Sequence, residues 1–156
     1  MPNFGATIVW QRAIGDAFAD GKFSRRHVWQ FDGGAHVPAS ASPHIVPPPL
    51  SAPADVDPEE AYVAALSSCH MLTFLYIAAS HGFVVDSYRD EARGTMQTDD
   101  RGHFSVTRVT LTPVVTYGGP PPDRETEAQL HQEAHAQCFL ANSVRTMITI
   151  GAAATI

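Results

Sequence analysis

The stretch from Ala61 to Ala79 most constrains how this chain folds, because it is apolar on nearly every side of a helix. It follows Asp57-Pro58-Glu59-Glu60, where Asp caps a helix, Pro takes the first helical position and two acids lie at the positive end of the helix dipole. We predict a helix from this cap to about Ser80, ended by His81-Gly82. A helix without a polar face must be surrounded by other elements, so it is predicted to be the central helix of the core.

The same stretch is nearly long enough to span a bilayer, but Ser67, Ser68, His70 and Thr73 interrupt it and no basic flank follows. A buried helix of a soluble protein is therefore predicted, with Cys69 in the interior of the fold. The N-terminal residues have no basic region followed by an apolar one, so nothing marks the chain for secretion. We expect a cytoplasmic protein that is not bound to a membrane.

The composition limits the domain organisation and the kinds of partner expected for this chain. With 156 residues, 44% of them hydrophobic, the chain is large enough for one domain with a real core, over residues 1–156. Its net charge of -6 and only 10 Lys and Arg residues give little support for a nucleic-acid partner. Two cysteines are too few for a disulfide scaffold, so they indicate redox chemistry, metal binding or simple packing as small hydrophobic side chains.

Alternating patterns before the helix predict strands. Ala6–Trp10 and Lys22–Phe31 alternate and are separated by glycine turns, which indicates an N-terminal antiparallel meander. The next segment, from Val37 to Pro58, lacks many backbone donors because it contains Pro38, Pro43, Pro47, Pro48, Pro49, Pro53 and Pro58. It is predicted to be an extended crossing segment within the domain.

A second set of strands follows the helix. Phe83–Thr98 and His103–Tyr117 predict a second hairpin with its turn at residues 99–102. Asp123 is expected to cap a second helix through about Leu140, and residues 143–152 read as a final strand. The predicted order is β-β-α-β-β-α-β. This order is typical of an α+β fold, with antiparallel sheets from the meander and the hairpin packed around two helices.

Cys69 and Cys138 are the residues best suited to chemistry. Cys69 lies midway along the first predicted helix and Cys138 at the end of the second. Helices packed 8–10 Å apart can bring two such thiols within disulfide reach. The spacing allows this geometry without proving it.

Three segments in fixed order carry a resemblance to a known family. They are Asp57-Pro58-Glu59-Glu60, the run Ala64-Ala65-Leu66-Ser67-Ser68-Cys69-His70-Met71, and Cys138-Phe139-Leu140-Ala141-Asn142-Ser143-Val144. Together they resemble the OsmC/Ohr family of osmotically inducible and organic hydroperoxide resistance proteins, in its OsmC-like subgroup, over nearly the whole chain. The resemblance implies the OsmC-like fold and an intertwined homodimer, in which the segment from 37 to 58 crosses between subunits.

The resemblance also implies an activity. A member of this family is a thiol-dependent peroxidase that reduces organic hydroperoxides in oxidative-stress defence and needs no cofactor. Cys69 would be the peroxidatic thiol and Cys138 the resolving thiol, joined in an intramolecular disulfide that a dithiol reductant, often a lipoyl-bearing protein, reduces. Apolar neighbours such as Met71 and Leu72 would bind the organic part of the substrate.

Glu59 and an arginine complete the site that the resemblance implies. Glu59, ten residues before Cys69, matches the family's active-site carboxylate, which pairs with an arginine. We assign this role to Arg25, because it alternates in phase with the apolar residues of its predicted strand and so faces inward, whereas Arg26 faces solvent. An arginine near the thiol stabilises the thiolate and binds the peroxide oxygens.

Two other functions remain open from the residues alone. His131, His135 and Cys138 lie at i, i+4 and i+7 on one helix face, where Cys69-His70 can complete a transition-metal site. Alternatively, the chain is a non-enzymatic, stress-related binding protein in which both thiols are only packed. The sequence assigns no role to His27, His70, His131 or His135.

Overall fold

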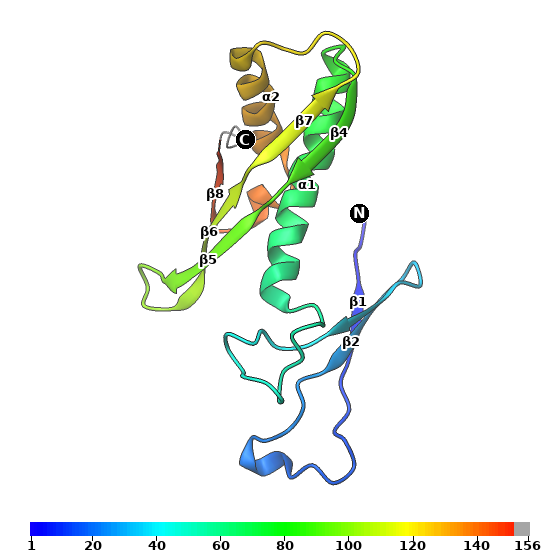
Figure 1. The fold of residues 1–156 in the computed structure, drawn as a ribbon, viewed down its shortest axis with the longest axis vertical. Helices are drawn as coiled ribbons and strands as arrows, with labels where there is room; N and C mark the ends of the chain where they lie inside the picture. The colour runs from blue at the N-terminus through cyan, green and yellow to red at the C-terminus, as the bar shows by residue number, and fades with distance from the viewer. Residues whose placement is uncertain (152–156) are drawn as a thin grey trace. The chain divides into compact units, whose positions relative to one another are not determined.

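The computed structural model describes residues 1–151 and confirms an α+β fold of two α-helices and several antiparallel strand pairs (Figure 1). Contacts within the chain define two compact units, Met1–Ala61 and Tyr62–Ile156. The boundary lies inside the helix α1 (Pro58–Ser80), and the prediction of a single domain stays a prediction. Ala152, at the end of the last predicted strand, lies outside the described residues.

The first unit contains a three-stranded meander, one strand more than predicted. β1 (Ala6–Val9) pairs with β2 (His27–Phe31), and β2 pairs with β3 (His36–Ala39), both antiparallel. The sequence did not predict β3, because Pro38 made residues 37–39 look like part of the extended Pro-rich segment. An edge strand such as β3 nevertheless tolerates a proline. The predicted second strand is also too long, because residues 22–26 precede β2 and form an irregular segment.

The helix α1 has the predicted bounds and the predicted cap. The Asp57 carboxylate accepts a hydrogen bond from the Glu60 backbone N–H at 2.8 Å, and the Glu60 carboxylate accepts one from the Asp57 N–H at 2.8 Å. Among the described helices, only α1 is long and apolar enough to cross a membrane by length and composition. It packs instead in the core through one stripe of buried side chains, namely Leu66, His70, Phe74, Ile77 and Ala78.

The opposite side of α1 corrects the prediction that the whole helix is surrounded. Leu72 is 61% exposed and Tyr76 is 71% exposed. Cys69, at the edge of the buried stripe, is half-buried and not fully interior as predicted. A single chain therefore covers one side of this apolar helix and leaves the other open.

The second hairpin is present, but each of its long strands is broken into two. β4 (Val85–Asp90) pairs with β7 (Pro113–Tyr117), whereas β5 (Arg93–Thr98) pairs with β6 (Phe104–Leu111) in a separate sheet. Asp90 lies at the break, where its carboxylate accepts hydrogen bonds from the Thr112 N–H at 2.6 Å and from the Ser67 hydroxyl. One carboxylate thus ties both strands to the middle of α1.

The last third of the chain departs most from the prediction. α2 (Arg124–Gln137) begins at the predicted Asp123 cap but ends before Leu140, and a 3₁₀ turn (Ala141–Ser143) follows. The final strand, β8 (Met147–Ile150), is shorter than predicted and lies parallel to β6.

Two apolar clusters place α1 at the centre of the second unit. One cluster joins the C-terminal half of α1 to α2 and the β4–β7 pair, which lie beside it in Figure 1, through Phe74, Ile77, Ala78, Leu130 and Ala134. The other joins the earlier part of α1 to the β5-β6-β8 sheet through Leu66, Val109 and Leu111. Cys69 lies on α1 between Leu66, which belongs to one cluster, and Phe74, which belongs to the other.

Candidate functional site

The two cysteines lie in direct contact. Cys138 Sγ is 3.0 Å from Cys69 Sγ, and both thiols are free. α2 ends at Gln137, and Cys138 is the cap residue with extended backbone angles, which turns its side chain towards α1. Its backbone carbonyl accepts a hydrogen bond from the Asn142 N–H at 3.1 Å, which fixes the turn after the helix. The helix α1 therefore positions Cys69, and the end of α2 with the turn after it positions Cys138.

The two thiols differ in their surroundings. Cys138 is only 1% exposed, and burial raises the pKa of its thiol, so it stays protonated and donates its S–H to Cys69. Cys69 is half-buried and accepts that hydrogen bond. Cys69 is the better candidate for the nucleophile, because a substrate can reach it from outside, whereas Cys138 is buried and protonated.

A pair of buried histidines lies on the same two helices. His70 Nε2 is 3.1 Å from His131 Nδ1, and His131 also stacks on Phe74 with 4.2 Å between ring centroids. His70 is 2% exposed and His131 is 8% exposed. Burial lowers the pKa of each imidazole to about 4, so both rings are neutral at physiological pH and one donates to the other.

The histidines do not form the metal site that the sequence left open. Within residues 1–151, no group of three or more His, Cys, Asp or Glu side chains is arranged to hold a metal ion. The Nδ1 atoms of His70 and His135 are buried and have no hydrogen-bond partner among the described residues. Of the three residues that the i, i+4 and i+7 spacing singled out, His131 contacts His70 and Cys138 contacts Cys69.

Arg25 lies in the irregular segment before β2, so its assignment to a strand is wrong. Its backbone N–H donates to the Leu50 carbonyl at 2.8 Å. Its guanidinium donates to the carbonyls of Gly21 and Phe23 and lies 3.6 Å from the centroid of the Phe23 ring. Within the described part of the chain no carboxylate pairs with this guanidinium, and its charge is left uncompensated.

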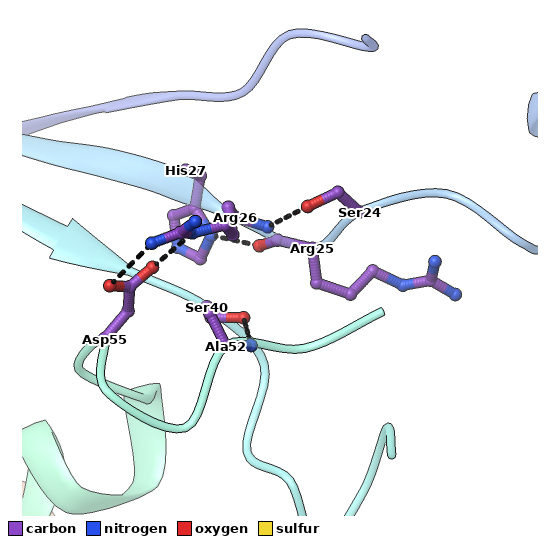
Figure 2. Close-up of polar contacts among 7 residues, drawn as sticks. All are labelled: Ser24, Arg25, Arg26, His27, Ser40, Ala52 and Asp55. Carbon is purple, nitrogen blue, oxygen red and sulfur yellow. Dashed lines mark hydrogen bonds and ion pairs between the residues drawn. The ribbon is translucent and has the colours of Figure 1, made fainter. Parts of the chain in front are cut away.

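Arg26 has a carboxylate partner that the sequence did not indicate. Its Nε is 2.8 Å from Asp55 Oδ2, in the Pro-rich segment, and the Asp55 side chain is only 9% exposed. Figure 2 shows the Arg26 guanidinium against Asp55, whereas the Arg25 side chain extends away from that pair. The two neighbouring arginines thus differ in charge compensation, which the strand pattern of the sequence did not indicate.

The remaining predicted site residues lie on α1. Glu59 is half-buried in the first turn of the helix, and no ion pair joins it to Arg25 within residues 1–151. Met71 is half-buried and Leu72 is exposed. A single chain therefore brings together the two cysteines but not the proposed arginine and carboxylate.

Comparison with known proteins gives a consistent family. The family model described as OsmC-like protein matches residues 51–152. An OsmC-like protein of unknown function from Vibrio cholerae is 48% identical, with 97% of this chain and 99% of that chain covered and a TM-score of 0.95. No sequence among curated proteins matches this chain.

More distant solved structures share the fold. An organic hydroperoxide resistance protein from Elizabethkingia anophelis is 17% identical over 99% of this chain and 98% of that one, with a TM-score of 0.73. An OsmC-like protein from Mycoplasma pneumoniae is 15% identical over 97% and 96%, with a TM-score of 0.69. At these identities the likeness concerns the fold alone.

Proposed function

Because this chain belongs to the OsmC-like protein family, we propose that it is a thiol-dependent peroxidase that reduces organic hydroperoxides in oxidative-stress defence. The observation that carries this proposal is the 3.0 Å contact between Cys69 Sγ and Cys138 Sγ. The name of the related Elizabethkingia anophelis protein, which concerns organic hydroperoxide resistance, supports the substrate class.

The first step of the proposed reaction takes place at Cys69. Its thiolate attacks the terminal peroxide oxygen, the O–O bond breaks, and the alkoxide leaves and takes up a proton to give an alcohol. Cys69 is left as a sulfenic acid, which is two electrons more oxidised than the thiol. Met71 and Leu72 follow Cys69 along α1 and supply apolar surface for the organic group.

The second step uses the buried thiol. Cys138 Sγ attacks Cys69 Sγ, an S–S bond forms, the S–O bond breaks, and the hydroxide leaves as water with the Cys138 proton. The 3.0 Å separation of the two sulfur atoms supports this step without a large rearrangement. A dithiol reductant, such as a lipoyl-bearing protein, then returns both cysteines to thiols. Such a cycle requires a reducing compartment, and we assign the protein to the cytoplasm.

Arg25 and Glu59 complete the proposed site. The uncompensated charge of Arg25 supports its role in stabilising the Cys69 thiolate and the leaving alkoxide, whereas the charge of Arg26 is already paired with Asp55. Glu59 would orient Arg25. Because the two do not pair within one chain, this contact is proposed to form in the dimer.

A thiol titration tests the proposed function. Addition of one equivalent of cumene hydroperoxide to the reduced protein is expected to remove two thiols per chain, because sulfenic acid formation at Cys69 is followed by disulfide formation with Cys138. The measurement is reaction with a chromogenic thiol reagent in denaturant, and hydrogen peroxide at the same concentration serves as the comparison substrate. Retention of both thiols after the hydroperoxide would refute the proposal.

We also propose that the protein is a homodimer. The first unit has no large buried apolar side chain, since its buried residues are Ala39, Ser40, Ser42 and Ser51. A unit of this size without a core of its own is not stable alone. The second unit leaves Leu72 and Tyr76 exposed on α1. A second copy of the chain is the partner that would both support the first unit and cover the exposed side of α1.

Light scattering at micromolar concentration is expected to give twice the mass of the chain. Tyr76→Glu is expected to shift the protein towards the monomer, because it places a charge on the exposed apolar stripe of α1. Gln132→Glu adds the same charge to an exposed position of α2 and serves as the control. A monomeric mass for the active wild-type protein would contradict the dimer.

A further inference from the structure

The contact between His70 and His131 is a buried side-chain hydrogen bond between α1 and α2. Within residues 1–151, the only other side-chain hydrogen bond between α1 and α2 or its cap residue is the one from Cys138 to Cys69. The two ring planes are nearly parallel, with an angle of 12° between them. The ring of Phe74, which belongs to the same buried stripe of α1, also stacks on the His131 ring. Buried, neutral and stacked, the pair fixes the spacing and the register of the two helices at this point.

The thiol pair lies on the same two helices and close to this contact in sequence. Cys69 directly precedes His70 on α1, and Cys138, the residue that caps α2, follows His131 by seven residues. Seven residues are two helical turns, roughly 10 Å along the axis. Because α2 is helical from His131 to Gln137 and Cys138 comes directly after it, we expect a shift at the histidines to reach the two sulfur atoms.

Disulfide formation is sensitive to such a shift. The sulfur atoms are 3.0 Å apart, and the bond requires them to approach to about 2.05 Å with a restricted dihedral angle. A misplacement of 1 Å at a reacting centre can cost about a hundredfold in rate. The end of α2 and the turn that follows it hold the buried Cys138.

We propose that His70 and His131 are positioning residues for the resolving step, in which Cys138 condenses with the sulfenic acid of Cys69. This inference rests on the proposed function. The histidines neither touch the peroxide nor exchange a proton with the thiols; they hold the helices so that Cys138 Sγ meets Cys69 Sγ. Attack on the peroxide forms a bond to Cys69 alone, and the end of α2 affects it only through the hydrogen bond from the Cys138 S–H, whereas the S–S bond forms only if Cys138 reaches Cys69.

The atoms used in the contact provide matched pairs of variants. His131 uses Nδ1, whose position an asparagine amide reproduces and a glutamine amide does not. His70 uses Nε2, whose position a glutamine amide reproduces and an asparagine amide does not. His131→Asn and His70→Gln therefore keep the contact, whereas His131→Gln and His70→Asn lose it, with the same amide chemistry in all four.

Rapid mixing with one equivalent of cumene hydroperoxide, followed by quenching and intact-mass analysis, separates sulfenic acid formation from disulfide formation. In His131→Gln and His70→Asn, disulfide formation is expected to slow by about tenfold to a hundredfold, with sulfenic acid formation within about twofold of wild type. In His131→Asn and His70→Gln, both steps are expected to stay within about threefold. Equal disulfide rates within a matched pair, or equal slowing of both steps, would overturn the inference.

A second measurement separates this inference from the proposed function. Disulfide formation between Cys69 and Cys138 is also driven by oxidised dithiothreitol, which requires no peroxidase activity. The variants that lose the contact are expected to form the disulfide more slowly and to show a less negative reduction potential than their matched partners. A wild-type protein inert to peroxide would refute the peroxidase, whereas matched variants with identical behaviour in dithiothreitol would refute the positioning role. Because the two pairs lie on different helices, a variant that fails to fold leaves the other pair to decide.

Discussion

Cys69→Ser is expected to abolish reduction of organic hydroperoxides, with a loss on the order of 10⁴-fold or more, the scale seen when a catalytic nucleophile is removed. A serine hydroxyl is not ionised at neutral pH and is a poor nucleophile towards peroxide oxygen, whereas a thiolate is a strong one. Within residues 1–151, the only other thiol is the buried Cys138, which is protonated and 1% exposed. The measurement is peroxide consumption with excess dithiothreitol as reductant.

Cys138→Ser is the matched control for that result. It keeps the nucleophile and removes only the resolving thiol, so one equivalent of hydroperoxide is still expected to oxidise Cys69, which then remains as the sulfenic acid or is oxidised further. Intact-mass analysis distinguishes these products from the disulfide. Activity of Cys69→Ser close to that of wild type, or a Cys69 that stays reduced in Cys138→Ser, would assign the chemistry to other residues.

The fold was predictable where the signal was local. The cap at Asp57, the end of α1 near Ser80 and the Asp123 cap of α2 follow from backbone hydrogen bonds that neighbouring residues satisfy. The break of each long strand was not predictable in the same way. It depends on Asp90, whose carboxylate reaches Ser67 and Thr112, residues more than 20 positions away in opposite directions.

The parallel pairing of β8 with β6 shows the same limit. Periodicity indicates that residues 143–150 contain a strand but carries no information on which neighbour it pairs with or in which direction. Packing in the core sets the direction of β8, since Ile148 and Ile150 pack against the cluster that contains Leu66, Val109 and Leu111. The strand direction is therefore a property of tertiary packing.

The sequence allowed the contact between the two cysteines of the candidate site to be anticipated, but not the ion-pair partners of its arginines. A cysteine in the middle of one helix and a cysteine at the end of another suggested a contact, and the structure brings their sulfur atoms to 3.0 Å. Nothing in the sequence distinguished Arg25 from Arg26 by charge compensation, because the partner Asp55 lies in the Pro-rich segment, where no periodicity indicates which side chains meet. The sequence did not predict the contact of His70 with His131 either, although the spacing of His131 from His135 and Cys138 had singled out His131.

Arg25→Ala is expected to slow hydroperoxide reduction by about 10²- to 10³-fold, the cost of removing one group that stabilises developing charge in a transition state. The guanidinium of Arg25 has carbonyl and aromatic partners but no carboxylate within residues 1–151, so its full positive charge is available to a thiolate and an alkoxide. In the proposed dimer, in which Arg25 lies beside Cys69, loss of this positive charge is expected to slow alkylation of Cys69 near neutral pH, because the thiolate loses an opposite charge. The measurement is the alkylation rate with iodoacetamide against pH, alongside kcat/KM.

Three variants make this prediction specific. Arg25→Lys is expected to restore the alkylation profile more fully than kcat/KM, because lysine keeps the charge but cannot hold two peroxide oxygens with a planar fork. Glu59→Gln is expected to show a milder defect of the same kind, since it leaves Arg25 charged but poorly oriented. Arg26→Ala removes a neighbouring charge that Asp55 already compensates, so it is expected to leave the alkylation profile close to that of wild type. A larger defect in Arg26→Ala than in Arg25→Ala would show that the paired arginine, with Asp55 in place of Glu59 as its carboxylate, is the one that acts on the thiolate.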